Sequence, residues 1–187
     1  YPPAMLAAGD RAPKIELLAA DGSTFDLGSK RGQPVVVYFY PRDDTPGCTV
    51  EAIDFTKASR DFDEAGATVV GISRDSIASH CRFRDKHKLS VTLLSDPDLS
   101  VHKAFGAWGE KTMYGKKVEG VIRSTFLVGP DGKIARAWPD VKVAGHVGAV
   151  LAACRGEEAP PGVTVKKASA KKATARKPAA KKSAAKK

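Results

Sequence analysis

One cysteine in the sequence stands where thiol chemistry is favoured. Cys48 ends the stretch PRDDTPGC at residues 41–48, which follows an apolar run at 35–40 and opens a helical pattern. At the N-terminus of a helix, unpaired backbone N–H groups and the helix dipole stabilise negative charge, which lowers a thiol pKa from about 8.5 toward neutrality. The spacing therefore predicts a reactive thiolate at Cys48. The alternative is an inert cysteine buried at a strand–helix junction.

The residues before Cys48 are suited to assist attack of its thiolate on a peroxide. Such an attack needs the O–O bond held in line and support for the departing oxygen, where negative charge develops. Thr45, three residues earlier, can turn its hydroxyl toward the sulfur and toward a peroxide oxygen. Pro41 fixes the chain at the strand exit and shields the pocket from water. The backbone N–H groups of Gly47 and Cys48 would face the peroxide oxygens.

This chemistry also needs a cation, and Arg123 is the best candidate. It directly precedes the apolar stretch 124–128, so a neighbouring strand end can bring it to the same pocket. Arginine suits the task because its fork donates two aligned hydrogen bonds and does not lose its charge. Glu51, in the first helical turn, either pairs with Arg123 or reflects the ordinary acidity of a helix start.

Strand and helix patterns alternate along the chain and must position these residues. Apolar runs predict strands at 35–40, 68–72, 91–94 and 124–128. Paired short runs predict two hairpins. One covers 15–27 and turns at Asp21-Gly22, and the other covers 124–138 and turns at Pro130-Asp131-Gly132. Helical spacing extends from Cys48 to Gly66, over 76–88, through Val101 to Phe105 and from Gly145 to Cys154. We interpret 106–120 as a loop.

This order of elements predicts an α/β fold in which a central mixed sheet is flanked by helices. It is compatible with a thioredoxin-like fold that carries an N-terminal hairpin.

Charge is distributed unevenly along the 187 residues. Ten of the 31 Lys and Arg residues lie in 159–187, which contains no Asp or Glu, so residues 1–158 hold 21 charges of each sign. The Lys- and Ala-rich segment has no aromatic residue and cannot bury enough apolar surface to fold, so we predict that it is disordered. We therefore divide the chain into an extension at 1–7, one domain at 8–156 and a basic tail at 157–187.

The titratable residues give no sign of a metal site or a disulfide framework. Cys48, Cys81 and Cys154 are widely spaced, and the four histidines, His80, His87, His102 and His146, are scattered. We expect no metal and no cofactor. We place His80 on the solvated surface of its helix, with promotion of the neighbouring Cys81 thiolate as the alternative. Reduced thiols fit a cytoplasmic protein. No apolar run approaches the roughly 20 residues that span a bilayer, and the first residues do not resemble a signal peptide.

The same residues resemble a known family. The spacing Pro41-x-x-x-Thr45-x-x-Cys48 is the peroxiredoxin active-site pattern, and the longer stretch YPRDDTPGCTVEA at 40–52 closely resembles the bacterial Q-type branch, also called bacterioferritin comigratory protein. Further matching stretches follow in order at 71–76, 94–98 and 120–127. The resemblance covers roughly residues 8–154.

The resemblance implies a thioredoxin fold and the thiol-dependent reduction of hydrogen peroxide and organic hydroperoxides. Cys48 would be the peroxidatic cysteine and would pass through a sulfenic acid. Pro41, Thr45 and Arg123 would complete the pocket. The family also implies recycling by thioredoxin or a similar dithiol, and a monomeric enzyme.

A sulfenic acid is commonly rescued by a second thiol. In many Q-type enzymes that thiol lies five residues after the peroxidatic cysteine, where this chain has Ile53. Another subgroup places it on the helix after the second strand, about one turn beyond Cys81, where this chain has Arg84. We therefore expect Cys81 to resolve, after local unwinding that brings its Cα within about 7 Å of that of Cys48. Cys154, or a one-cysteine mechanism with an external thiol, is the alternative.

The tail at 159–187 resembles the basic tails of linker-histone-like proteins. Its ten positive charges can release counterions from DNA, which gives sequence-independent and salt-dependent binding. Acidic membrane surfaces, other polyanions or a solubilising role without a partner are alternatives. The rival hypothesis for the whole chain is a nucleic-acid-associated structural protein with a vestigial fold. The intact set of Pro41, Thr45, Cys48 and Arg123 argues against it.

Overall fold

The computed structural model describes residues 5–139 and 141–156. The expected extension at 1–7 is described only from residue 5, and the expected tail at 157–187 lies outside the described residues. The strands are β1 (Glu16–Leu18), β2 (Thr24–Asp26), β3 (Val35–Phe39), β4 (Thr68–Ser73), β5 (Thr92–Ser95), β6 (Trp108–Met113), β7 (Lys116–Val121), β8 (Ser124–Val128) and β9 (Ile134–Trp138).

The helices of the described part are α1 (Pro46–Lys57), α2 (Ser59–Glu64), α3 (Ile77–His87), α4 (Ser100–Phe105) and α5 (His146–Cys154), with a short 3-10 turn η1 at Leu27–Lys30. None of them is long and apolar enough to cross a bilayer.

The central sheet is mixed and has five strands in the order β5-β4-β3-β8-β9. β3 pairs parallel to β4 and antiparallel to β8, so the chain runs in both directions through the middle of the sheet. All five residues of β3 are buried, as its unbroken apolar run predicts. The predicted α/β fold with a mixed sheet is confirmed, and β1 and β2 form the expected N-terminal hairpin.

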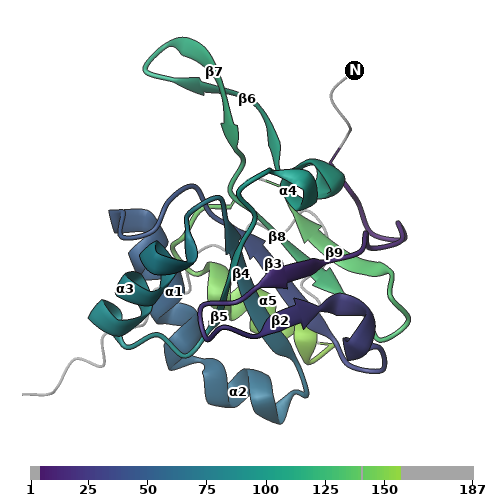
Figure 1. Ribbon diagram of the computed structural model, residues 1–187. Coiled ribbons are helices and arrows are strands. Elements are labelled where there is room, and N and C mark those ends of the chain that lie inside the picture. The colour runs from purple at the N-terminus through teal and green to yellow at the C-terminus, as the bar shows by residue number, and fades with distance from the viewer. Residues whose placement is uncertain (1–4, 140, 157–187) are drawn as a thin grey trace, which may run out of the picture. The chain divides into compact units, whose positions relative to one another are not determined.

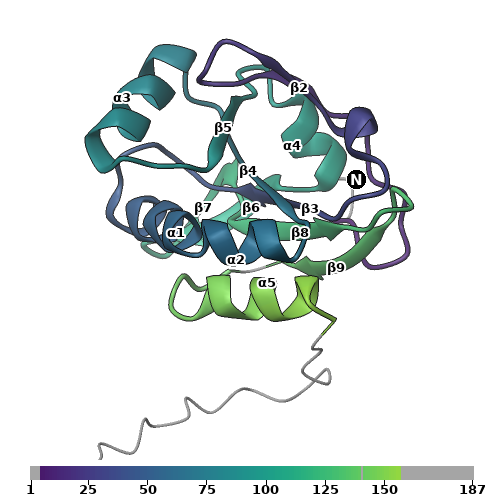
Figure 2. The same ribbon diagram turned by 90° about the horizontal axis from the view of Figure 1, so that it is seen from below.

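Each face of the sheet has its own hydrophobic cluster. Val36 and Tyr38 of β3 pack with α1, α2 and α5, whereas Val37 and Phe39 pack with α4 and the N-terminal hairpin. Figure 2 shows α1, α2 and α5 together on one side of the sheet and α4 on the other. The alternation along β3 therefore separates two layers, and the chain leaves this central strand directly into the loop that precedes Cys48.

The single helix predicted from Cys48 to Gly66 is two helices. The backbone turns at Ala58, where φ is −89° and ψ is 2°, and α2 then continues toward Glu64. Phe55 of α1 and Phe62 of α2 are both buried, with ring centroids 5.7 Å apart. Neither Gly nor Pro marks the turn, so the sequence carries no local signal for it.

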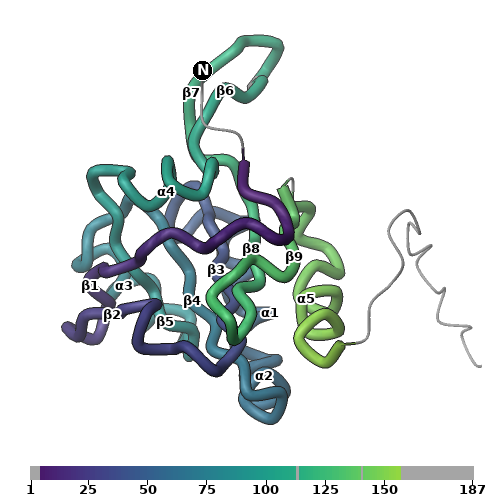
Figure 3. The backbone as a smooth tube through the Cα atoms, turned by 90° about the vertical axis from the view of Figure 1, so that its right-hand side faces the viewer, coloured from purple at the N-terminus to yellow at the C-terminus, as the bar shows by residue number. Residues whose placement is uncertain are grey.

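The interpretation of 106–120 as a loop was wrong. These residues form the antiparallel pair β6–β7, a ribbon that projects from the rest of the domain in Figures 1 and 3. Its turn is Tyr114-Gly115, in which both residues have positive φ (51° and 75°). Asn-Gly is the usual sequence for such a turn, and the exposed strands carry no alternating apolar pattern. The sequence therefore offers little sign of this hairpin.

Candidate active site

Cys48 lies in the first turn of α1, directly after the loop that leaves β3. Its side chain is buried, with 2% of the residue surface exposed. Thr45 is the N-cap residue, yet its hydroxyl makes no cap to the helix and instead donates to the Arg42 carbonyl at 2.9 Å. The first helical hydrogen bond runs from the Thr49 N–H to the Thr45 carbonyl at 2.8 Å. The N–H groups of Gly47 and Cys48 therefore precede the helical ladder, beside the sulfur.

Sheet register brings Arg123 to this cysteine across 75 residues. Phe39, the last residue of β3, pairs with Ser124, the first residue of β8. Arg123 therefore lies at the same edge of the sheet as the loop that leaves β3. Its Nη2 donates to the Cys48 Sγ at 3.1 Å, and only 19% of its side chain is exposed. A fixed positive charge is thereby held in hydrogen-bond contact with the Cys48 sulfur.

Glu51 holds the other side of the Arg123 guanidinium. Its Oε1 accepts from Arg123 Nη1 at 3.2 Å, and the carboxyl is 1% exposed. Burial raises the pKa of Glu51 from 4.5 to about 7, and the neighbouring Arg123 charge opposes this rise. Of the two interpretations of Glu51, pairing with Arg123 is the one that the structure shows. The carboxyl holds Nη1 of the guanidinium while Nη2 donates to the sulfur.

Gly47 lets the guanidinium approach the helix start. A Cβ added at Gly47 would lie 3.2 Å from Arg123 Nη2, closer than ordinary van der Waals contact. Any side chain here would compete for the space that the cation occupies beside Cys48. The Gly in the TPGC stretch therefore serves the position of Arg123, and not only the turn.

Two further polar side chains near the site carry no charge. Burial, with the Arg123 charge adding to it, lowers the pKa of His146 from 6.5 to about 4, so this ring is neutral at physiological pH. Its Nε2 lies 2.7 Å from the Thr125 hydroxyl. Burial raises the pKa of Tyr38, with the Glu51 charge as the next cause. Arg123 is consequently the cation that faces Cys48.

The other two cysteines differ in their surroundings. Cys81 lies on α3, half-buried, and its Sγ donates to the Ala20 carbonyl at 3.2 Å. Cys154 lies at the end of α5, where burial raises its pKa from 9.0 to about 11. All three thiols are free in this structure, and the sulfurs of Cys48 and Cys81 face different partners.

The prediction that His80 lies on a solvated helix surface was wrong. His80 is fully buried, and its Nδ1 lies 2.6 Å from a carboxylate oxygen of Asp43, in the loop before Cys48. Sequence reasoning missed both residues. One signal was present, because His80 is three residues before Phe83 and the two side chains share the inward face of α3.

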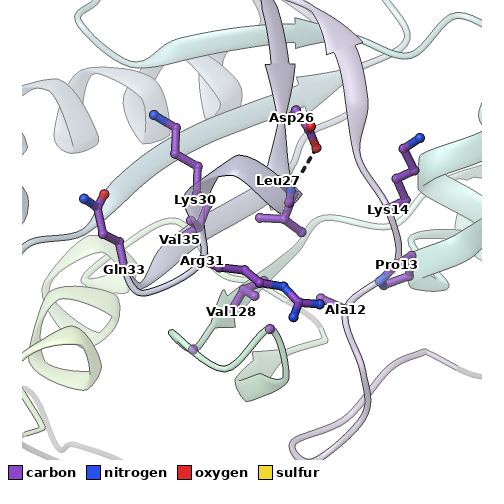
Figure 4. A pocket seen from close by; sticks show the side chains of 13 residues that line it. Ala12, Pro13, Lys14, Asp26, Leu27, Lys30, Arg31, Gln33, Val35 and Val128 are labelled. Atoms are coloured by element: carbon purple, nitrogen blue, oxygen red, sulfur yellow. Dashed lines mark hydrogen bonds between the residues drawn. The ribbon is translucent and has the colours of Figure 1, made fainter.

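A cavity of about 350 Å³ lies away from these residues. It opens near Val35 at the start of β3 and Val128 at the end of β8, whereas Cys48 follows the opposite end of β3 (Figure 4). The guanidinium of Arg31 reaches across it toward Ala12. Neither Cys48 nor Arg123 lines this cavity, so its size does not make it the reactive site. Among the residues that the structure describes, no cluster of His, Cys, Asp or Glu could hold a metal ion.

Comparison with known proteins identifies the family of the chain. The chain matches the AhpC/TSA family over residues 8–137. The chain belongs to the AhpC/TSA family. It is 47% identical to peroxiredoxin Bcp of Xanthomonas campestris, over 75% of this chain and 88% of that protein. It is 44% identical to peroxiredoxin Bcp of Escherichia coli K12, over 78% and 94%. This chain is therefore a peroxiredoxin similar to the Bcp enzymes, and it is a thiol peroxidase.

Solved structures give the same result. Peroxiredoxin Q of Xanthomonas campestris superposes with a TM-score of 0.75 at 44% identity, over 80% of this chain and 97% of that one. Another structure from that organism, with the same TM-score and identity, concerns the alkyl peroxide reduction activity of its bacterioferritin comigratory protein and covers 80% and 98% of the two chains. The thioredoxin-like peroxiredoxin fold is thereby confirmed.

Gly47→Ala tests whether the close approach of Arg123 matters. We expect a folded protein whose kcat/KM for peroxide falls about tenfold, because displacing the guanidinium weakens a charge-assisted hydrogen bond worth roughly 1.5–3 kcal/mol. Gly148→Ala is the matched control, since an added Cβ there meets no atom within 4 Å. Unchanged peroxide kinetics in Gly47→Ala would contradict the role assigned to this glycine.

Glu51→Gln tests the raised pKa of Glu51. Between pH 4.5 and about 7 the folded state keeps a proton on Glu51 that the unfolded state has lost, so wild-type stability falls as pH rises through this window. A rise of about 2.5 in pKa corresponds to at most about 3 kcal/mol. We expect the variant to gain stability relative to wild type by up to this amount from pH 5 to pH 8, measured by urea unfolding. Parallel pH profiles of the two proteins would show that the carboxyl does not titrate in this range.

Proposed function

We propose that this peroxiredoxin reduces hydrogen peroxide and organic hydroperoxides through a sulfenic acid at Cys48, which Cys81 resolves and a thioredoxin-type dithiol reduces. One observation carries the proposal. A buried cysteine at a helix start receives a hydrogen bond from a fixed arginine, Arg123, at 3.1 Å. The alkyl peroxide activity named for the Xanthomonas campestris relative supports the inclusion of organic hydroperoxides.

In the first step the Cys48 thiolate attacks the terminal oxygen of the peroxide. The S–O bond forms as the O–O bond breaks, the sulfur loses two electrons, and the departing oxygen leaves as an alkoxide or hydroxide that takes a proton. Arg123 donates toward the oxygens as charge shifts from sulfur to the leaving group, and its second nitrogen remains on Glu51. The guanidinium therefore stabilises the transition state without first having to be oriented.

Thr45 orients the peroxide as a hydrogen-bond acceptor. The Thr45 hydroxyl donates its proton to the Arg42 carbonyl. The lone pairs of the hydroxyl oxygen therefore remain free to accept a hydrogen bond from the O–H of the substrate. Acceptance from the peroxide was one half of the role expected for Thr45, and donation to the sulfur, the other half, is replaced here by the hydrogen bond from Arg123 to Cys48. The N–H groups of Gly47 and Cys48 are placed to donate to the peroxide oxygens, and Pro41 limits access of water at the strand exit.

In the second step the Cys81 thiolate attacks the Cys48 sulfur. The S–S bond forms, the S–O bond breaks, and the oxygen leaves as water after taking a proton. Cys81 is preferred to Cys154, because burial holds the pKa of Cys154 at about 11 and keeps it a thiol at physiological pH. A dithiol reductant of the thioredoxin class then reduces the disulfide and is itself oxidised. The chain must rearrange for this step, since the two sulfurs face different partners in the folded structure.

A second proposed function concerns the basic tail. Ten Lys and Arg residues in 159–187, without an acidic residue, favour binding to DNA or another polyanion. The domain at 8–156 would supply peroxidase activity independently of it.

Mass spectrometry of peroxide-treated protein tests the assignment of the two cysteines. With one equivalent of peroxide we expect a peptide pair joined by a Cys48–Cys81 disulfide, and none in Cys81→Ser. Peroxide consumption driven by a thioredoxin system should be lost in Cys48→Ser and retained in Cys154→Ser. Activity that persists without Cys48 would refute the mechanism. A Cys48 sulfinic acid without any disulfide in the wild-type protein would refute the resolving role of Cys81.

Deletion of 159–187 tests the tail. We expect DNA retardation at low salt to disappear in the truncated protein while peroxide reduction is retained, because non-specific binding depends on phosphate neutralisation. In the full chain, retardation should fall steeply as salt rises. Equal retardation by the truncated protein would contradict the assignment of binding to the tail.

A further inference from the structure

A buried carboxylate ties the loop that carries Cys48 to the first turn of α3. The Asp43 carboxylate accepts from the Tyr40 hydroxyl at 2.6 Å and from the Ser79 hydroxyl at 2.9 Å. Its Oδ2 also lies 2.6 Å from Nδ1 of His80. The backbone N–H of Asp43 donates to the Asp75 carboxylate at 2.9 Å. One loop residue thus contacts the ends of β3 and β4 and the start of α3.

His80 completes this arrangement with both ring nitrogens. Its Nε2 lies 2.9 Å from the Leu94 carbonyl of β5, and a carbonyl can only accept, so Nε2 carries a proton. The Asp43 carboxylate already accepts two hydroxyl protons, and one further proton lies between its Oδ2 and Nδ1 of His80. The exposed surface of the His80 side chain is 0% and that of Asp43 is 3%. Separation of the two would leave each of them buried without its partner.

A second, exposed tie follows at the next residue. Asp44 has a positive φ of 58°, which is uncommon for a residue with a side chain. Its carboxylate accepts from Lys86 Nζ at 2.7 Å and lies 2.9 Å from Nε2 of His87, in the last turn of α3. These hydrogen bonds lower the pKa of Asp44, with that from Lys86 as the larger cause. The loop is therefore held near both ends of α3.

This tie opposes the second half of the proposed reaction. Cys48 is 2% exposed, so another thiol reaches its sulfur only when the loop moves away. Cys81 is adjacent to His80 on α3, yet its sulfur faces the Ala20 carbonyl. Release of the loop from α3 would separate Asp43 from His80 and Ser79.

We propose that Asp43 and His80 are positioning residues that hold oxidised Cys48 in the Arg123 pocket and thereby set its fate. The inference rests on the proposed sulfenic acid chemistry of Cys48. While the loop is held, a second peroxide can oxidise the sulfenate: a new S–O bond forms, the O–O bond breaks, sulfur loses two more electrons to give sulfinic acid, and an alcohol or water leaves. When the loop is released, the resolving thiol forms the disulfide instead.

Asp43→Ala removes the tie, and the chain offers a matched control. Asp96 and His102 form another buried pair, 2.6 Å apart with both side chains 0% exposed. The Asp96 carboxylate accepts from Ser100 and His102 of α4, not from the Cys48 loop. Asp96→Ala therefore reproduces the loss of a buried carboxylate without release of the loop. Asp43→Asn is the conservative variant, because its amide can accept from Tyr40 and donate to His80.

The first measurement is the ratio of Cys48 sulfinic acid to disulfide over a peroxide titration, by mass spectrometry. We expect Asp43→Ala to lower this ratio roughly tenfold, Asp43→Asn to stay within about twofold of wild type, and Asp96→Ala to leave it unchanged at a comparable loss of melting temperature. An unchanged ratio in Asp43→Ala, or an equal decrease in Asp96→Ala, would overturn the proposal.

The second measurement separates this proposal from the role of Cys81. In a Cys81→Ser background, the rate at which dimedone labels the Cys48 sulfenic acid reports exposure of the sulfur to solvent. We expect this rate to rise roughly tenfold with Asp43→Ala and to be unaffected by Asp96→Ala. A wild-type chain that forms no Cys48–Cys81 disulfide would refute the resolving cysteine, while the labelling rates still decide the role of Asp43.

Ser79→Ala covers the case in which Asp43→Ala does not fold. It removes one hydroxyl donor from the Asp43 carboxylate and leaves the contact with His80 in place. We expect faster labelling and less sulfinic acid than in wild type, by a smaller factor than for complete removal of the carboxylate. A folded Ser79→Ala protein with wild-type values of both quantities would count against the tie.

Discussion

The site depends on an arginine held against a buried sulfur. Arg123 and Cys48 are far apart in the chain, and neither helix packing nor loop flexibility brings them together. The antiparallel register of β3 and β8 does so, because it places the exit of one strand beside the entry of the other. Glu51 then holds Nη1 of the guanidinium, and Gly47 leaves the space that Nη2 occupies. The cation is therefore in position before any substrate arrives.

Two parts of the fold hold the two halves of the site. The sheet supports Arg123 through strand register, whereas α3 supports the Cys48 loop through Asp43 and His80. Sheet register is shared by many backbone hydrogen bonds and does not change easily, but the contact with α3 is made by a few side chains. An enzyme that must first hold its sulfur and later release it gains from this difference, because the loop can move while the cation stays in place.

The sequence predicts an element correctly when a single local pattern determines that element, and much of this structure is of that kind. The apolar run of β3 and the TPGC start of α1 are such patterns, and they located Cys48 at a helix N-terminus. The β6–β7 hairpin was missed because its strand sequences do not alternate between apolar and polar residues and its turn is Tyr114-Gly115. His80 was misplaced because its hydrogen-bond partner Asp43 lies 37 residues away, and the one local signal, its spacing from Phe83, does not identify that partner.

The β6–β7 ribbon has a consequence for how this domain tolerates change. The ribbon pairs only within itself among the described strands, and its base is closed by a hydrogen bond from the Ile122 N–H to the Ala107 carbonyl at 2.7 Å. After the ribbon, the chain rejoins the central sheet at Ser124, immediately after Arg123, where β8 pairs with β3. The length of the ribbon is thus decoupled from the reactive centre, and an inserted segment at Tyr114-Gly115 adds only a closure entropy that grows slowly with its length. The tip of this ribbon is the natural point at which to graft a peptide or a reporter domain.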